Sequence, residues 1–398
     1  MNSNFFLQKK FRASAAYQLV EWSDITVMEQ EGLEGFYDDN EVYGIFRPAH
    51  SSRGASIKIA FRDVALLFLH LQQANCLPRY FTHSGTQDLD STIAKMVLDN
   101  ILEIESNGNY ISGPPALQII FGDILTEASV LPDYLSELSM KGMRYAFMLR
   151  NLDARSMANR LYTFNTRPFD PVAKTEYDSY LTLSDFLVPK KDAELNYLLT
   201  KHWQFAEGTE KKGWLSWTRL DYIQDTTFRQ RNFVYKLYIS PRLEDLQQVF
   251  RVSIPVLSSS HAFAFKAGST LPQVLRPDKM VVYFHSKEAL IGSAAMLENE
   301  LASFEPQGVP YTKQLDKKGM LSWGADQPNQ EETNTSLNES WRFNVSNQLA
   351  LAIIQAQNEQ LTFQQSIPFI RATLSLAGVN IDDWTPTPRF FQTTSSTA

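Results

Sequence analysis

The 398-residue sequence predicts an α+β fold, with a mostly helical N-terminal half and a C-terminal mixed sheet flanked by helices. Three observations support this prediction. Residues 232–313 carry strand, helix, strand, strand and helix patterns in that order. Apolar positions recur at helical spacing in residues 62–71 and 88–101. The dipeptide Asn107-Gly108, between two alternating runs, is typical of a tight hairpin.

The composition is that of a folded protein, with 43% hydrophobic and 20% charged residues. A net charge of −7 argues against a general nucleic-acid binder. The single cysteine, Cys76, excludes an intrachain disulfide and a cysteine-rich zinc site. The sequence starts without a signal-peptide pattern, and its longest apolar run is too short to span a bilayer. We therefore expect a cytoplasmic protein with no membrane partner, and leave secretion by a signal-free route open.

The N-terminal region, residues 1–165, contains two helix patterns followed by the hairpin. This order has two interpretations: a small α+β subdomain, or a winged-helix module that binds a peptide along a strand edge. DNA binding is disfavoured, because the second helix pattern carries Lys95 against Asp90 and Asp99. Residues 123–163 predict further helices, and Pro168 and Pro171 mark the end of this region.

Residues 166–227 form an aromatic-rich connecting segment that includes Trp203, Trp214 and Trp217. Aromatic density of this kind is usually packing, and no chemistry is predicted for it. The third region, residues 228–390, holds the strand and helix patterns of residues 232–313. It then has a polar stretch at 325–340 and amphipathic helix patterns at 341–357 and 364–378.

Charge and motifs narrow the chemistry of the third region. From residue 229 to 318 there are 12 Lys or Arg and 8 Asp or Glu, a local charge of +4 that suggests an anionic ligand. The alternative is a solvated face with incidental lysines. No Walker, dinucleotide-binding, HExxH or GxSxG motif is present. The six histidines lack metal-ligand spacing, so neither a metal nor another cofactor is expected.

One predicted strand, residues 261–266, separates its side chains by strict alternation. His261, Phe263 and Phe265 fall on one face, and Lys266 falls on the other. His285 ends the next predicted strand. Each histidine also has a purely structural interpretation, as a strand-end residue that is hydrogen-bonded to the backbone.

Several short segments of this region, YKLYIS, SHAFAFKAG, DKMVVYFH, GVPYTKQL and SWRFNVSNQLALAI, resemble the HopA-type effector family over residues 228–385. The matching motif residues are Phe265-Lys266 and Pro310, Thr312 and Lys313. The family includes type III effectors and HopA-like domains of class V lanthipeptide and thioamitide pathways. In those pathways a partner kinase phosphorylates Ser or Thr of a precursor peptide. The HopA-like domain then removes the phosphate, as a phosphothreonine lyase does, to give a dehydroamino acid.

The resemblance implies a phospho-Ser/Thr lyase that needs no cofactor and acts on a phosphorylated precursor peptide. Such an elimination requires a base for the Cα proton and cations for the phosphate. We expect Lys266 as the base and His261 or His285 as the acid. The expected phosphate-binding residues are Arg276, Lys313, Arg231 and Arg342.

Two segments depart from the family pattern. Gln327 separates Asp326 from Pro328, and Ser346-Asn347 stand where the family has Arg-Cys. These departures favour the alternative, a non-catalytic HopA-like effector or scaffold that binds a partner protein or peptide.

Overall fold

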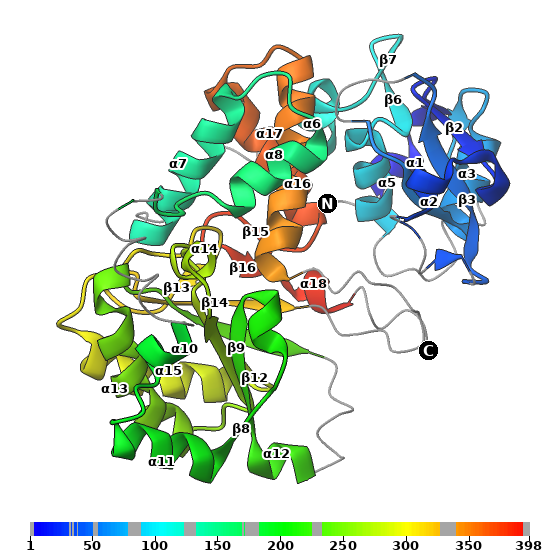
Figure 1. The fold of residues 1–398 in the computed structure, drawn as a ribbon. Coiled ribbons are helices and arrows are strands. Elements are labelled where there is room, and N and C mark those ends of the chain that lie inside the picture. Colours follow the sequence, from blue (N-terminus) through cyan, green and yellow to red (C-terminus); the bar gives the residue numbers. More distant parts are fainter. Residues whose placement is uncertain are drawn as a thin grey trace.

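The computed structural model describes residues 4–31, 33, 36–37, 39–50, 55–78, 89–122, 133–168, 171, 183–224, 233–326 and 340–392. Figure 1 shows three parts: an N-terminal module in blue, a layer of helices drawn in teal and orange, and a large sheet with its own helices in green and yellow. Helices and strands both contribute substantially, which confirms the α+β class. Among the described residues, none of the helices combines the length and apolar character needed to cross a membrane.

The N-terminal module is built on two antiparallel sheets that the predicted helical half did not include, although helical residues still outnumber strand residues in the described part of residues 1–165. One sheet has the order β5-β1-β6-β7 and the other β2-β3-β4. Their strands are short, and short runs give little alternation to detect in the sequence. The bounds are β1 (Lys10–Ala13), β2 (Tyr17–Val20), β3 (Val42–Pro48), β4 (Lys58–Phe61), β5 (Asn75–Cys76), β6 (Leu102–Ser106) and β7 (Asn109–Ile111).

The module's helices pack on these sheets, and the predicted hairpin is confirmed. Strands β6 and β7 pair around Asn107 and Gly108, whose φ angles of 52° and 82° are those of the mirror-image turn that suits a hairpin. The winged-helix assignment stays a prediction. The helices are α1 (Asn4–Leu7), α2 (Val27–Glu31), α3 (Arg62–His70) and α5 (Leu89–Leu98), with one 3-10 turn, η1 (Trp22–Asp24).

The helical layer joins two segments far apart in the sequence. Helices α7 (Tyr134–Met148) and α8 (Ala154–Tyr162) pack on α16 (Trp341–Asn358), which also packs on α17 (Phe363–Leu376). Side chains of Asp133, Asp153 and Thr362 cap the starts of α7, α8 and α17 by accepting hydrogen bonds from backbone N–H groups. Because α16 is covered on several sides, its apolar residues are spread around the helix. The short α6 (Leu117–Phe121) precedes this layer.

The large sheet has seven strands in the order β13-β14-β10-β12-β11-β9-β8. All its pairings among the described residues are antiparallel, so the prediction of a mixed sheet is wrong. β10 and β11 do run in the same direction, but β12 inserts between them. The bounds are β8 (Trp203–Phe205), β9 (Trp214–Arg219), β10 (Val234–Ile239), β11 (Ala264–Gly268), β12 (Met280–Phe284), β13 (Lys313–Gln314) and β14 (Leu321–Asp326).

Helices cover one face of this sheet, on the left in Figure 1. The aromatic-rich segment supplies β8 and β9, so its tryptophans belong to the same sheet as Lys266. The remaining bounds are α10 (Leu183–Leu187), α11 (Ala193–His202), α12 (Leu220–Gln224), α13 (Leu246–Ser259), α14 (Leu271–Val274), α15 (Lys287–Leu301), β15 (Val379–Asn380), β16 (Thr385–Pro386) and α18 (Pro388–Gln392).

Candidate functional site

The two faces of the large sheet have different chemistry, and strand register assigns each residue to a face. Phe265 lies opposite Val282 and Trp217, on the face that α13 and its neighbouring helices cover. Lys266 lies opposite Val281, which in turn lies opposite Tyr238. Lys236 and Tyr283 are paired on that same second face. The second face therefore gathers amines and phenols from three adjacent strands.

On this polar face four cations alternate with three aromatic rings. The Lys236 and Lys266 amines lie 5.5 and 6.0 Å from the centre of the Tyr283 ring. Lys266 and the Arg276 guanidinium lie 4.2 and 5.6 Å from the centre of the Trp214 ring. Because shared rings join consecutive members, these groups form one cluster, which also includes Tyr162 and Arg342.

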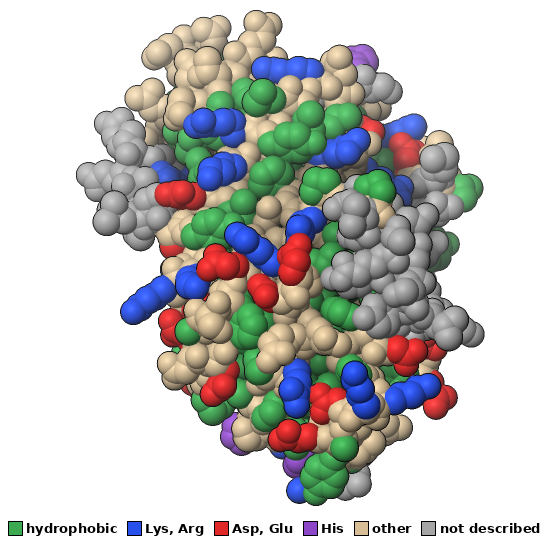
Figure 2. Space-filling model, turned by 60° about the vertical axis from the view of Figure 1, so that its left-hand side comes forward, with side chains coloured by type: hydrophobic (Ala, Val, Ile, Leu, Met, Phe, Trp, Pro, Cys, Tyr) green, Lys and Arg blue, Asp and Glu red, His purple; other side chains and the backbone are tan. Residues whose placement is uncertain are grey.

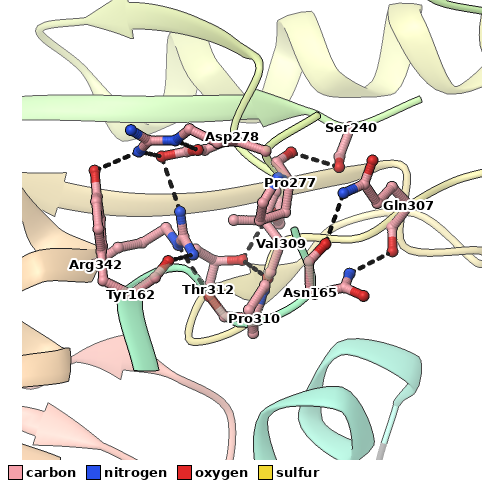
Figure 3. A network of polar contacts seen from close by, with 12 residues as sticks. Tyr162, Asn165, Ser240, Pro277, Asp278, Gln307, Val309, Pro310, Thr312 and Arg342 are labelled. Carbon is pink, nitrogen blue, oxygen red and sulfur yellow. Dashed lines mark hydrogen bonds and ion pairs between the residues drawn. The ribbon is translucent and has the colours of Figure 1, made fainter. Parts of the chain in front are cut away.

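Asp278 holds the two arginines of the cluster in place. Arg276 donates two hydrogen bonds to its carboxylate, each 2.8 Å long, and Arg342 pairs with it at 2.8 Å. The two guanidiniums lie 4.9 and 5.0 Å from the centre of the Tyr162 ring, and Arg276 also donates to the Tyr162 hydroxyl at 2.6 Å. Figure 3 shows Asp278, Arg342 and Tyr162 converging from three separate segments. A bidentate pair of this kind fixes guanidinium direction.

Backbone hydrogen bonds fix the segments that carry these groups. Arg342 donates to the Tyr162 carbonyl at 2.8 Å and to the Pro310 carbonyl at 3.3 Å. Asn165 donates to the Gln307 carbonyl, and the Gln307 amide donates back to the Asn165 carbonyl (Figure 3). The end of α8 is thereby tied to the loop before β13, which orders the arginine side of the cluster.

Asp326 organises the lysine side. Its carboxylate pairs with the Lys236 amine and accepts a hydrogen bond from the Trp341 backbone N–H at 2.9 Å. The start of α16 can lie this close because Gly324 has no side chain. A Cβ there would come within 2.4 Å of the Trp341 ring. Gly324 therefore lets α16 bring Arg342 onto the polar face.

The cluster has a buried floor and a half-exposed rim. Arg342, Asp278, Lys236 and Tyr238 are buried, at 1 to 8% exposure. The rim consists of partly exposed side chains: Lys266, Arg276, Tyr283, Trp214 and Tyr162. Four cations and two carboxylates leave a net charge of +2, which complements a phosphate monoester of roughly −1.5 to −2 charge. On the face shown in Figure 2, by contrast, acidic and basic side chains are interspersed.

Lys266 differs from the other three cations because no carboxylate pairs with it among the described residues. Burial lowers the pKa of Lys266 to about 8, and the charges of Lys236 and Arg276 push it in the same direction, against the opposing effect of Asp278. A lysine with such a pKa is partly neutral near physiological pH and can accept a proton. The other three cations each pair with a carboxylate, Lys236 with Asp326 and the two arginines with Asp278.

Asp278 and Tyr238 on the floor and Tyr283 on the rim have pKa values that keep their charge states fixed. Burial raises the pKa of Asp278, but Arg342 and Arg276 outweigh it and hold the pKa far below its usual range. Burial and the charge of Asp326 raise the pKa of Tyr238 and of Tyr283 well above 10. Both phenols stay protonated at neutral pH and can donate hydrogen bonds.

The structure brings three of the predicted site residues together: Lys266, Arg276 and Arg342. It does not bring the histidines to them. His261 is exposed and precedes β11 by three residues, which puts it five residues or roughly 17 Å of extended chain from Lys266. His285 stacks on Phe263, 4.1 Å away, and lies four residues past the Val281 position opposite Lys266, or roughly 13 Å.

The remaining predicted cations lie elsewhere. Lys313 is on β13, four strands from β11 or roughly 19 Å, and pairs with Asp383 at 3.6 Å. Arg231 lies outside the described residues. No group of histidine, cysteine or carboxylate side chains that could hold a metal ion occurs in the part of the chain that the structure describes.

Sequence reasoning missed four members of the cluster, Lys236, Tyr283, Trp214 and Tyr162, and also Asp278, which holds its two arginines. Alternation along residues 234–239 could have found Lys236, because it places Lys236 and Tyr238 on the face opposite Leu237. Trp214 begins β9 and Tyr283 lies on β12, whereas Asp278 and Tyr162 come from a loop and from the end of α8, and the sequence carries no signal that these residues meet.

Comparisons with known proteins give distant structural likenesses. No family model and no curated protein matches the chain. It is similar to the effector protein from Pseudomonas syringae pv. tomato strain DC3000, with a TM-score of 0.36 and 13% identity over 64% of this chain and 97% of that one.

The effector protein from Pseudomonas syringae pv. syringae strain 61 gives a TM-score of 0.37 and 13% identity over 65% and 99% of the two chains. The type III effector and phosphothreonine lyase OspF from Shigella flexneri gives 0.27 and 12% identity over 35% and 75%. At TM-scores below 0.5, these likenesses carry no conclusion about activity or site residues.

Proposed function

We propose that the chain is a phospho-Ser/Thr lyase that eliminates phosphate from a peptide to leave a dehydroamino acid. The observation that carries this proposal is the position of Lys266, partly neutral and without a carboxylate partner among the described residues, beside three cations that are paired with carboxylates. Acid or base catalysis alone would not call for the three cations. Phosphate binding alone would not call for an amine whose pKa is lowered to about 8.

In the proposed reaction the neutral Lys266 amine takes the Cα proton of the phosphorylated residue. The electron pair of that C–H bond forms the Cα–Cβ double bond, and the Cβ–O bond breaks with its pair going to phosphate. Arg276 and Arg342 bind the phosphate oxygens, as arginine forks do. Lys236 supports the developing enolate charge.

The leaving phosphate needs a proton as the Cβ–O bond breaks. We assign this role to Tyr238, because it stays protonated at neutral pH and lies on the same sheet face as Lys266, with Val281 between them in the register. The proton taken by Lys266 returns to solvent, and Tyr238 is reprotonated from solvent, so that the enzyme ends as it began. In this assignment Tyr238 replaces His261 and His285.

A peptide-maturation setting follows from the sequence resemblance to HopA-like domains. The substrate would be a precursor peptide that a partner kinase has phosphorylated on Ser or Thr. The alternative is an effector or scaffold that binds such a peptide without turning it over. The departures from the family pattern at Gln327 and Ser346-Asn347 favour this alternative. In either case, a phosphate can reach the buried Arg342 side chain only if the floor opens.

Mass spectrometry of a phosphothreonine peptide incubated with the full chain tests the proposal. The expected result is loss of the elements of phosphoric acid and release of inorganic phosphate. Lys266→Met should abolish this reaction but retain phosphopeptide binding. The matched control is Lys287→Met, which removes an amine 4.7 Å from the centre of the Trp323 ring outside the cluster. Binding without phosphate loss in the wild-type chain, or full turnover by Lys266→Met, would contradict the proposal.

A further inference from the structure

A second surface, on the N-terminal module, exposes aromatic side chains that no described element covers. Tyr37 is 65% exposed and Phe61 is 43% exposed. Trp22 contacts Tyr37 with 5.2 Å between ring centres, and Phe36 contacts Phe61 at 6.3 Å. We call these four residues the aromatic patch. Large exposed apolar groups that lie together mark an interaction surface more often than isolated ones do.

The sequence segment that supplies three of these four aromatic residues is strongly acidic. Residues 21–41 contain eight Asp or Glu and no Lys or Arg, a charge of −8. The whole chain is −7, so the other 377 residues together are at +1 (−7 minus −8). The acidity of the protein is therefore concentrated in the segment that also supplies Trp22, Phe36 and Tyr37.

Neighbouring basic side chains compensate little of this charge. Arg47 pairs with Glu29 at 3.6 Å, and Arg62 pairs with Glu41 at 3.7 Å. Glu21 and Asp24, on either side of Trp22, have no ion pair within the described parts of the chain. Both are exposed. The surface thus offers rings and unneutralised carboxylates together.

We infer that the aromatic patch docks a cationic amphipathic segment of the peptide on which the lyase site acts. Lysine and arginine side chains suit this surface, because their stems cover apolar area and their heads interact with ring faces and carboxylates. The same negative charge repels nucleic acid and anionic lipid. The acidic segment 21–41, which carries most of the patch, and the basic cluster on the sheet have opposite charge. The first should therefore bind a basic segment, and the second a phosphorylated residue.

This inference rests on the proposed function only for the identity of the peptide. Figure 1 shows the N-terminal module at a distance from the large sheet, so one peptide would reach both places only through an extended linker. Two sites joined by a linker raise the effective concentration of the second segment once the first has bound.

Binding is tested with a fluorescein-labelled Lys/Leu amphipathic peptide without phosphate, and with a Glu/Leu peptide of equal length. The full chain should bind the basic peptide with an affinity that falls as the salt concentration rises, and it should not bind the acidic peptide. Tyr37→Ser combined with Glu21→Lys should weaken binding by about tenfold or more. Tyr197→Ser is the matched control, because Tyr197 is 58% exposed on α11. Equal binding by the double variant would overturn the inference.

A second assay separates this inference from the lyase proposal. A short phosphopeptide should be eliminated equally by wild type and the patch variant. A phosphopeptide joined to the basic segment should show a KM about tenfold lower with the wild type only. Elimination without any advantage for the joined peptide would refute docking and leave the lyase standing. Binding of the basic peptide without elimination of either substrate would refute the lyase and leave docking standing.

Discussion

The two faces of the large sheet come from the same strands, yet one is a core and the other a candidate site. On β11 the side chain of Phe265 is buried among Trp203, Trp217 and Phe250, while its neighbour Lys266 lies over Trp214 on the opposite face. Adjacent residues of one strand therefore have different roles here: one contributes to the core and the next to the candidate site. Substitutions on the two faces should therefore separate unfolding from loss of activity.

Asp278→Ala should have the largest effect, because it acts on both properties. Removing this carboxylate leaves Arg276 and Arg342 without their shared partner, and breaking a buried pair costs roughly 3–5 kcal/mol. Elimination should be lost as well, since both phosphate-binding groups lose their orientation. Urea unfolding measures the first effect and phosphate release the second. An Asp278→Ala variant with wild-type stability would show that the ion pairs of Asp278 with Arg276 and Arg342 do not stabilise the fold.

Phe265→Ala should lower the free energy of unfolding but leave the activity of the folded molecules unchanged. Phe265 is 1% exposed in the aromatic core, and truncating such a side chain costs roughly 3–5 kcal/mol. The fraction that remains folded should eliminate phosphate at the wild-type rate per folded molecule. Lys266→Met is the reciprocal variant: it should be inactive, and at least as stable as wild type, because it removes an amine whose charged form is disfavoured by burial and by Lys236 and Arg276. If Phe265→Ala also loses activity per folded molecule, the two faces are not separable.

Tyr238→Phe tests the assignment of the acid. The substitution removes the phenol oxygen and keeps the ring that packs with Val281 and Val309. General acid catalysis contributes typically 10²–10⁴-fold, so we expect kcat to fall by about 100-fold with KM little changed. A peptide with a better leaving group than phosphate should be less affected. An equal loss for both leaving groups would assign Tyr238 a structural role.

How much of this was foreseeable differs between the core and the site. Strand alternation predicted Lys266 and Phe265 on opposite faces, because period-2 geometry is local. The Asn107-Gly108 hairpin was also local. Asp278 and Tyr162 could not be predicted, because their proximity to Arg342 depends on packing between α8, α16 and a loop before β12. The two tryptophan-rich strands β8 and β9 were missed because aromatic runs have no distinctive period.

The pH profile sharpens the comparison further, because the proposed base on the polar face, Lys266, has a pKa close to neutrality. The free-enzyme pKa of Lys266 is about 8, set by burial and by Lys236 and Arg276, with Asp278 and Asp326 opposing. The neutral amine is the active form. Therefore kcat/KM should rise about tenfold per pH unit below 8 and level off above it. Lys236→Met, which removes a neighbouring positive charge, should shift this midpoint upward. A profile that falls with rising pH would exclude Lys266 as the base.

The smallest expected effect is that of the histidines. His261→Ala and His285→Asn should each change kcat/KM less than about twofold, because general catalysis requires hydrogen-bond reach of the reacting group and both lie far along their strands from Lys266. His285→Asn should instead lower stability slightly by removing the ring stacked on Phe263. The assay is phosphate release at pH 7 and pH 8.5, with melting temperature recorded on the same samples. A loss of 100-fold or more in either variant would return the acid role to that histidine and remove it from Tyr238.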